Sequence, residues 1–208
     1  MSVRHPPGRA GRIWLRGRLA TATHSAGLLE RKHEALGRER RRLAALVDQT
    51  ARDWEGAHRS ARTALLHVLL LDGRPTIERS HGRPSSARAV IRWQTTMGVT
   101  YPTEAACELD DDIPSAGPAA VPGAIDAYRA ATTAAVHHAA ATAALARVDA
   151  DLQGTGRRLR AIRDRLIPQL QEASRQLELA LDETEREDMI TMHSHLRNAL
   201  DTRGEVPP

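Results

Sequence analysis

The chain has 208 residues, 30 Lys and Arg against 26 Asp and Glu, and a formal net charge of +4. Aromatic residues are only 2% of it and phenylalanine is absent, which argues against a large globular core. The one cysteine, Cys107, excludes an intrachain disulfide and a zinc site built from cysteines. No apolar run reaches the roughly 20 residues that a membrane span needs. We therefore expect a helix-rich protein that is soluble or peripheral to a membrane.

The charge is distributed unevenly along the chain. Residues 1–46 carry eleven Arg or Lys and three Glu, whereas residues 172–188 carry seven acids and two Arg. A basic start and an acidic end predict an antiparallel hairpin in which the two ends lie side by side. Such flanking charges set the orientation of two helices more than they stabilise the pair.

Residues 1–11 contain proline and glycine and are predicted to form a flexible arm. From residue 12 to residue 71 the apolar residues recur every three or four positions, with a mean period of 3.5, which is typical of a left-handed coiled coil. The seam residues that we single out in this helix are Leu15, Leu19, Leu29, Leu36, Leu43, Val47 and Trp54. Three polar residues, His33, Arg40 and Thr50, also occupy the seam, and we interpret them as residues that set its register.

Residues 72–123 are predicted to form a β-hairpin and loop region. Asp72-Gly73-Arg74-Pro75 ends the first helix, because glycine suits a left-handed cap and proline blocks continuation. Residues 89–96 are a strand candidate, followed by a turn and a second extended segment that continues to about residue 109. The hairpin residues that we single out are Trp93, Met97, Gly98, Tyr101 and Pro102. Three aspartates at 110–112 and a Pro- and Gly-rich linker follow; we favour a solvated acidic loop there over a cation site.

A second helix is predicted over residues 124–199, with a flexible tail at 200–208. Its seam includes Leu159, Ile162, Leu166, Leu170 and Leu177. Two successive steps of four residues, 162–166–170, predict a local change of supercoil phase beside Pro168, which would cost about 3 kcal/mol in a regular helix. The fold class is therefore mainly α: a long antiparallel two-helix coiled coil with a small middle insertion that contains a β-hairpin.

No candidate site for catalysis, a cofactor or a metal stands out. His137 and His138 are adjacent, and His193 and His195 are two apart, whereas metal-binding pairs on a helix sit three or four residues apart. The arginines of the first helix are scattered around it, without an aromatic stacking platform, which disfavours nucleic-acid binding. We expect neither nucleic acid nor direct membrane insertion.

Three ordered motifs resemble the D subunit of the V-type/A-type rotary ATPases, the bacterial versions most closely. The opening PPGRAGRIWLRGRLATATHSAGLLERKHEAL is similar to the family's first helix. The segment WQTTMGVTYP resembles its strand and Gly-Val turn, and RRLRAI, LIPQL and the series from Glu178 to Glu187 resemble its closing helix. Together they extend over nearly the whole chain.

The resemblance implies a non-catalytic central rotor shaft, peripheral on the cytoplasmic side of the membrane. Its partners would be the hexamer of catalytic A and B subunits, the F subunit at its side, and the funnel-shaped C/d subunit above the membrane ion-translocating ring. We hypothesise that Arg9, Arg12, Arg16 and Arg18 contact the bore of the hexamer. The competing hypotheses are a coiled-coil adaptor and a basic nucleic-acid-binding rod.

Overall fold

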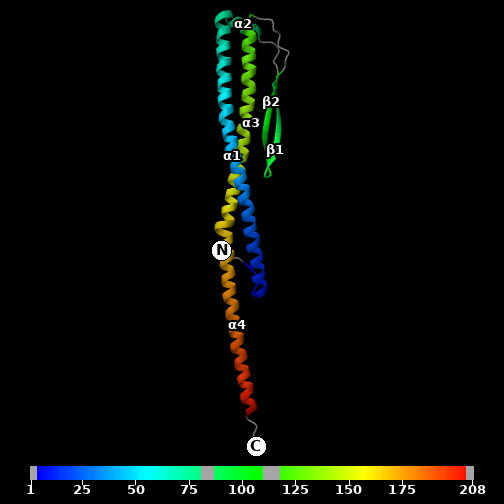
Figure 1. Cartoon of the computed structure of the whole chain (residues 1–208), viewed down its shortest axis with the longest axis vertical. Coiled ribbons are helices and arrows are strands. Elements are labelled where there is room, and N and C mark those ends of the chain that lie inside the picture. Colours follow the sequence, from blue (N-terminus) through cyan, green and yellow to red (C-terminus); the bar gives the residue numbers. More distant parts are fainter. Residues whose placement is uncertain (1–3, 81–86, 110–117, 205–208) are drawn as a thin grey trace. The chain divides into compact units, whose positions relative to one another are not determined.

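A computed structural model describes residues 4–80, 87–109 and 118–204. Two long helical stretches from the two ends of the chain pack together, and an antiparallel two-stranded hairpin lies between them in the sequence, which confirms the predicted fold class (Figure 1). The elements are α1 (Gly8–Asp72), α2 (Arg74–Ser80), β1 (Ala87–Thr96), β2 (Val99–Leu109), α3 (Ala120–Arg160), the π-helix η1 (Ala161–Leu166) and α4 (Ile167–Gly204).

Helix α1 begins at Gly8 rather than at residue 12. Gly11, in its first turns, is required by close packing, because a Cβ there would collide with the carbonyl oxygen of Pro6 and would lie 3.0 Å from Leu177 Cδ2. The helix ends as predicted: Gly73 has a φ of 72° and donates its N–H to the Leu69 carbonyl at 3.2 Å. The glycine closes the helix because it adopts this left-handed conformation without steric cost.

The middle of the chain differs from the prediction in two features, an additional short helix and an earlier start of α3. The short helix α2 is unpredicted; Pro75 stands in its first turn, where no backbone N–H is needed. Helix α3 begins at Ala120 rather than at residue 124, and Pro122 is tolerated for the same reason. At the other end, α4 continues to Gly204, past the predicted end at 199. The predicted loop at 82–86, the aspartates at 110–112 and the extreme termini lie outside the described residues.

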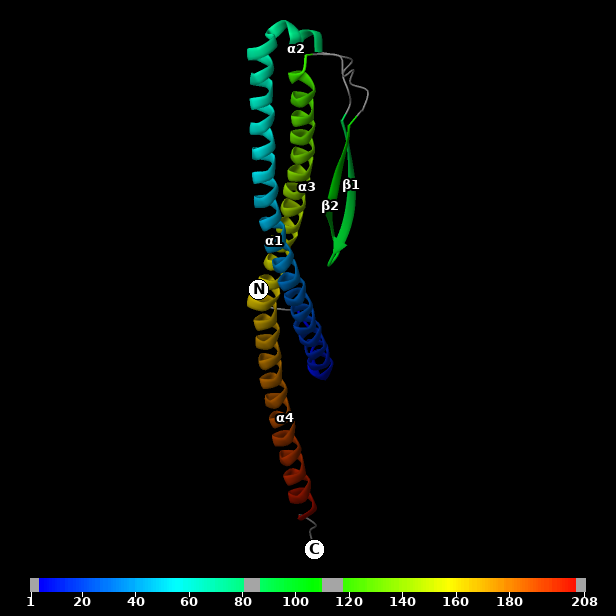
Figure 2. The ribbon, with the colours of Figure 1, turned by 45° about the horizontal axis from the view of Figure 1, so that its top comes forward.

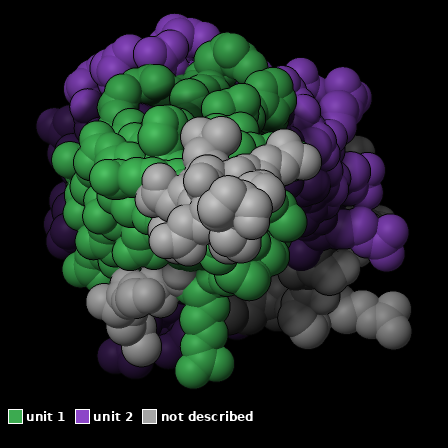
Figure 3. Space-filling model, turned by 90° about the horizontal axis from the view of Figure 1, so that it is seen from below, with its two compact units in different colours: residues 1–31, 156–208 green, residues 32–155 purple. Residues whose placement is uncertain are grey.

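The chain forms two compact units, coloured separately in Figure 3. The first contains residues 1–31 and 156–208, and its core joins α1 to η1 and α4 through the buried residues Leu15, Ala22, Leu170, Ala173 and Leu177. The second contains residues 32–155, and it has two buried clusters, one around Leu36, Leu43 and Val148 and one around Val68, Val121 and Ala124. Each fully buried leucine contributes about 1.5–3 kcal/mol, whereas exposed ion pairs contribute about 0–1 kcal/mol. The apolar seam therefore dominates the stability of both units.

The hairpin lies beside α3 within the second unit (Figure 2). Its strands pair from Ala87 with Leu109 to Thr96 with Val99, with a bulge between Arg92 and Trp93. Met97 and Gly98 form the two-residue turn, with φ values of 50° and 79°. A turn with two positive φ angles matches the twist of the strands that it joins.

The predicted change of supercoil phase coincides with the π-helix η1. The Ile167 N–H bonds to the carbonyl oxygen of Ile162, five residues earlier, and so adds one residue to that turn. Pro168 follows immediately and has no N–H to donate. The extra residue keeps Ile162 and Leu166 packed against the same core that contains Leu170 and Leu177.

Candidate functional site

The four arginines proposed from the sequence lie on the first turns of α1 and are all exposed. Arg9 contacts Glu185 of α4, with 3.3 Å between Nη2 and Oε1, so the basic start of the chain meets its acidic end. The guanidinium of Arg18 lies 5.6 Å from the ring centroid of Trp14, a cation–π contact. Arg12 and Arg16 are exposed to solvent. The structure thus places these arginines on the first three turns of α1, where Arg9, Arg12 and Arg16 share one face of the helix and Arg18 lies on the opposite face.

A second group of arginines lies opposite, on the end of α3 and on η1. We call residues 16–31 and 156–166 together the arginine belt; they contain eight arginines and two carboxylates. Glu30 bonds to Arg163 at 3.2 Å. Among the residues that the structure describes, no carboxylate pairs with the other belt arginines, which are Arg16, Arg18, Arg31, Arg157, Arg158, Arg160 and Arg165. The arginines of both segments are visible in the sequence. Only the antiparallel packing of the helices, however, brings residues 16–31 beside residues 156–166.

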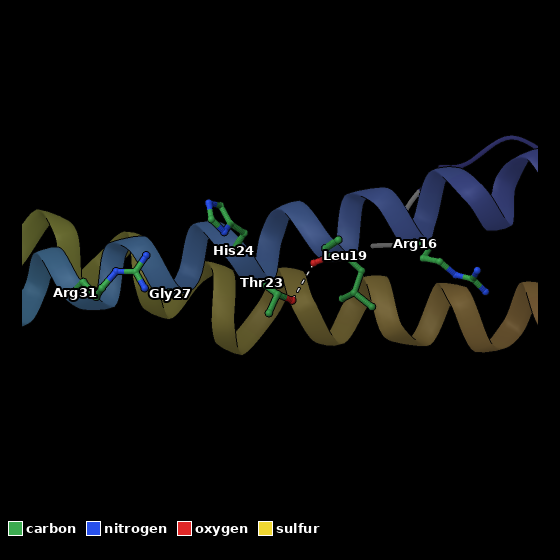
Figure 4. A pocket seen from close by; sticks show the side chains of 7 residues that line it. Arg16, Leu19, Thr23, His24, Gly27 and Arg31 are labelled. Carbon is green, nitrogen blue, oxygen red and sulfur yellow. Dashed lines mark hydrogen bonds between the residues drawn. The ribbon is translucent and has the colours of Figure 1, made fainter.

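A shallow groove of 580 Å³ runs along α1 within this belt (Figure 4). Arg16 and Arg31 stand at its two ends. Its lining between them consists of Leu19, Ala20, Thr23, His24 and Gly27. The Thr23 hydroxyl donates to the Leu19 carbonyl of its own helix at 2.9 Å, so the floor offers few free polar groups. Between its two cationic ends the groove is therefore mostly apolar, with Thr23 and the imidazole of His24 as its polar side chains.

The hairpin is anchored to the helices through Tyr101. Its side chain is fully buried among Leu36, Leu43 and Val148, and its hydroxyl donates to Glu39 Oε1 at 2.7 Å. The Glu39 carboxylate also accepts from Arg42 at 2.6 Å. The hydrogen bond from Arg42 lowers the pKa of Glu39 and outweighs the opposing effect of burial, while burial chiefly raises the pKa of Tyr101. Sequence reasoning found Tyr101 but missed its carboxylate partner.

The other hairpin residues remain more exposed. Trp93 is 50% exposed, and the guanidinium of Arg147 lies over its ring at 5.2 Å. Met97 and Gly98 form the turn, with Met97 53% exposed, and Pro102 is buried. The strand β1 is exposed along nearly its whole length, including Val90 and Ile91. The buried part of the hairpin is therefore the start of β2, where Val99, Tyr101 and Pro102 follow the exposed turn.

The seam residues singled out from the sequence differ in burial. Leu15, Leu36, Leu43, Leu170 and Leu177 are buried, whereas Leu19, Leu29, Val47, Leu159, Ile162 and Leu166 are half-buried. Trp54 is 39% exposed and stacks on His138 at 5.6 Å between ring centroids.

Two of the polar seam residues make contacts across the helix pair. The Thr50 hydroxyl donates to the Leu46 carbonyl at 2.9 Å and lies 3.2 Å from His138 Nδ1 on the facing helix. Arg40 donates Nε–H to Asp149 at 2.7 Å. His33 is half-buried. Paired polar groups of this kind can hold two helices in one register.

Two apolar surfaces lack a partner within the described part of the chain. One lies at the end of α1 and contains Leu66, Leu69, Leu70 and Leu71, with Leu70 82% exposed. The other lies on α4, where nearly every residue from 182 to 197 is exposed, including Met189, Ile190, Met192 and Leu196. Exposed apolar surfaces of this kind are typical of interfaces with other proteins.

The described residues contain no group of three or more His, Cys, Asp or Glu placed to hold a metal ion. They also contain no helix that is long and apolar enough to cross a membrane. The features that stand out are surfaces for contact: the arginine belt with its groove, the exposed hairpin, and the two apolar surfaces.

The fold and these surfaces define a coiled-coil protein built to contact other chains. The family model for the D subunit of ATP synthase matches residues 12–194, and the chain belongs to this family. It is therefore a stalk component of a rotary ATPase, a membrane-associated complex in which it assembles with other subunits. None of the curated proteins compared with the chain matches it.

Proposed function

We propose that the chain is the central rotor shaft, which transmits torque between the catalytic A/B hexamer and the membrane ion-translocating ring and catalyses nothing itself. The observation that carries the proposal is the match to the D-subunit family over residues 12–194, on a chain whose two ends form a paired helical stalk. Supercoiled helices resist twisting because each seam side chain packs among four residues of the facing helix. Such a pair is suited to carry a turning force.

The exposed charged and apolar surfaces of the chain support the assignment of several partner subunits. The arginines Arg9, Arg12, Arg16 and Arg18, with the exposed end of α4, would face the bore of the A/B hexamer. The exposed leucines at the end of α1 would seat on the funnel-shaped C/d subunit, and the F subunit would bind the side. The chain would lie on the cytoplasmic face of the membrane as a peripheral component. An asymmetric charged surface lets each rotary position favour a different state of the hexamer, since coupling requires differential contact.

Co-expression with the A, B and F subunits tests this function. We expect the chain to co-elute with them in size exclusion and to raise the ATP hydrolysis of the A/B hexamer. Reversing the charge at Arg9, Arg12, Arg16 and Arg18 together should lower this turnover. Reversal at Arg59 and Arg62, two exposed arginines of the second unit, serves as the control. A chain that neither co-elutes nor changes hydrolysis would instead act as an adaptor outside the complex.

A further inference from the structure

The apolar surface near the end of α4 forms a stripe that α1 does not cover. Met189, Met192 and Leu196 follow one another at steps of three and four residues, so they share one face of the helix, and they are 56–65% exposed. Met189 comes twelve residues after Leu177, which packs against α1, and therefore lies roughly 120° further around the helix. Helix α1 also does not reach this end of α4 (Figure 1). The stripe is therefore free to pack against a second helix.

The charges beside this stripe change sign along the helix. Residues 182–188 contain five carboxylates and one arginine. Residues 189–197 contain two histidines, one arginine and no carboxylate. The segment is thus acidic before the stripe and basic along it, and any helix that covers it must have the opposite order of charges.

The acids and bases are also arranged by side. Asp188 and His195 are seven residues apart and so lie on one side of the stripe. Glu183 and Arg197, fourteen residues apart, share the other side. Within the described part of the chain Asp188 forms no ion pair, and Glu183 makes only a contact of 3.6 Å with Arg186. Each side of the stripe therefore begins with an acid and ends with a base.

A second copy of the same helix, packed antiparallel, matches both the stripe and the charges. A two-fold axis near residue 190 places Met189 of one copy against Met192 of the other. The axis also keeps the same side of both helices together, so that Asp188 meets His195 of the other copy. A parallel pair would instead place the five carboxylates of one copy beside those of the other, which is unfavourable.

We propose that the free chain forms a symmetric dimer in which residues 182–197 of two copies pair antiparallel. Each copy contributes only three core side chains, so we expect a dissociation constant on the order of 10–100 μM. The dimer belongs to the chain before assembly and goes beyond the shaft function. If the shaft function holds, the ring covers the same surface, so dimer and assembled shaft exclude one another. Pairing would keep the apolar end of α4 covered until a ring receives it.

Sedimentation equilibrium of the full chain alone, from about 5 to about 500 μM, tests the pairing. Met192→Glu should weaken association at least about tenfold, because it places one carboxylate from each copy in the apolar centre of the interface. Leu179→Glu is the matched control, at a leucine of the same helix that is 70% exposed and lies off the stripe. It should leave association within about twofold of the wild type. Circular dichroism establishes that both variants are folded.

A charge exchange tests the antiparallel direction. Asp188→Arg should weaken the dimer about threefold or more, since the change occurs twice in the symmetric pair. Adding His195→Glu exchanges the acid and the base, and should restore association to within about twofold of the wild type. Stronger association of Asp188→Arg alone would indicate a parallel pair and overturn the proposal, as would a double variant no better than the single one.

Two further results would also overturn the dimer: a wild-type chain that stays monomeric at the highest concentration, and equal losses in Met192→Glu and Leu179→Glu. No other subunit is present in these measurements. Their failure would therefore leave the shaft function standing, which the co-expression with A, B and F tests separately.

Discussion

The Tyr101 hydroxyl is a single group on which the attachment of the hairpin depends. It is buried, donates to Glu39 at 2.7 Å and lies 2.9 Å from the Thr96 hydroxyl. Tyr101→Phe should lower the free energy of unfolding by about 1–2 kcal/mol, because a hydrogen bond to a charged group is lost while Arg42 still pairs with Glu39. Urea unfolding measures this change. Tyr128→Phe, at the other tyrosine, which is 39% exposed, should be neutral, and an equal loss there would contradict the prediction.

The Glu39 carboxyl makes stability depend on pH. The hydrogen bond from Arg42 lowers its pKa in the folded chain. A lowered pKa means that the stabilising contribution is present above the unfolded value of about 4.3 and is lost as the pH falls through the folded value. In the Glu39→Gln variant the free energy of unfolding should therefore fall less steeply with decreasing pH below about pH 4 than in the wild type. Urea unfolding at several pH values measures this slope. Glu34→Gln, at an exposed glutamate of the same helix, should leave the acid slope as in the wild type.

At the scale of the element, two features of the sequence account for the π-helix η1: the proline at position 168 and the extra residue in the spacing of the seam. Substitution and deletion can separate their effects. If the turn became α-helical, Leu170 and Leu177 would rotate by about 100° out of the core. We therefore expect Pro168→Ala alone to keep the π-turn and to melt at or slightly above the wild-type temperature. Deleting Asp164 alone removes the extra residue and leaves the proline in a regular helix, which should lower the melting temperature by roughly 5–10 °C.

The double variant distinguishes these causes. Deletion of Asp164 combined with Pro168→Ala should restore a regular helix with the seam in phase, and its melting temperature should return to within a few degrees of the wild type. Thermal circular dichroism provides the comparison. If the deletion alone melted like the wild-type chain, the π-turn would have no role in the register.

At the scale of the whole molecule, the last part of α4 contributes to contacts outside the chain rather than to its own stability. Among the residues of α4 whose burial the structure describes, which end at residue 197, Leu181 is the last that is half-buried, and residues 182–197 are exposed. A chain ending after Arg186 should therefore melt within about 2 °C of the full chain, since exposed pairs contribute little. The same truncation should impair co-elution with the A/B hexamer. A large drop in melting temperature would show that the segment packs against the body of the protein.

Local sequence signals predicted much of the fold. The 3.5-residue period located Leu15, Leu36 and Leu43 in the cores, and Gly73 marked the end of α1, because period and capping depend on neighbouring residues alone. The turn at Met97 and Gly98 was found for the same reason. Helix starts were less predictable, since a proline in the first turn, such as Pro122, is compatible with both a loop and a helix.

Contacts between distant segments were harder to predict. The partner of Tyr101 is Glu39, 62 residues earlier, and no local pattern connects them. The arginine belt likewise requires that residues 16–31 and 156–166 pair, and the groove is defined by side chains whose directions depend on that packing. The phase change beside Pro168 was visible as two steps of four residues, but its form as a π-turn was not.

The order in which the two units close follows from the antiparallel pairing. Contact between Val68 and Val121 closes a loop about a third as long as contact between Leu15 and Leu177, which makes its chain-entropy cost about 1 kcal/mol smaller. During synthesis the ribosome also releases both partners of the shorter loop long before α4 is made. Pairing of the helices should therefore begin near the α1–α2 junction and proceed toward the termini. The first turns of α1 consequently remain unpaired until translation is almost finished.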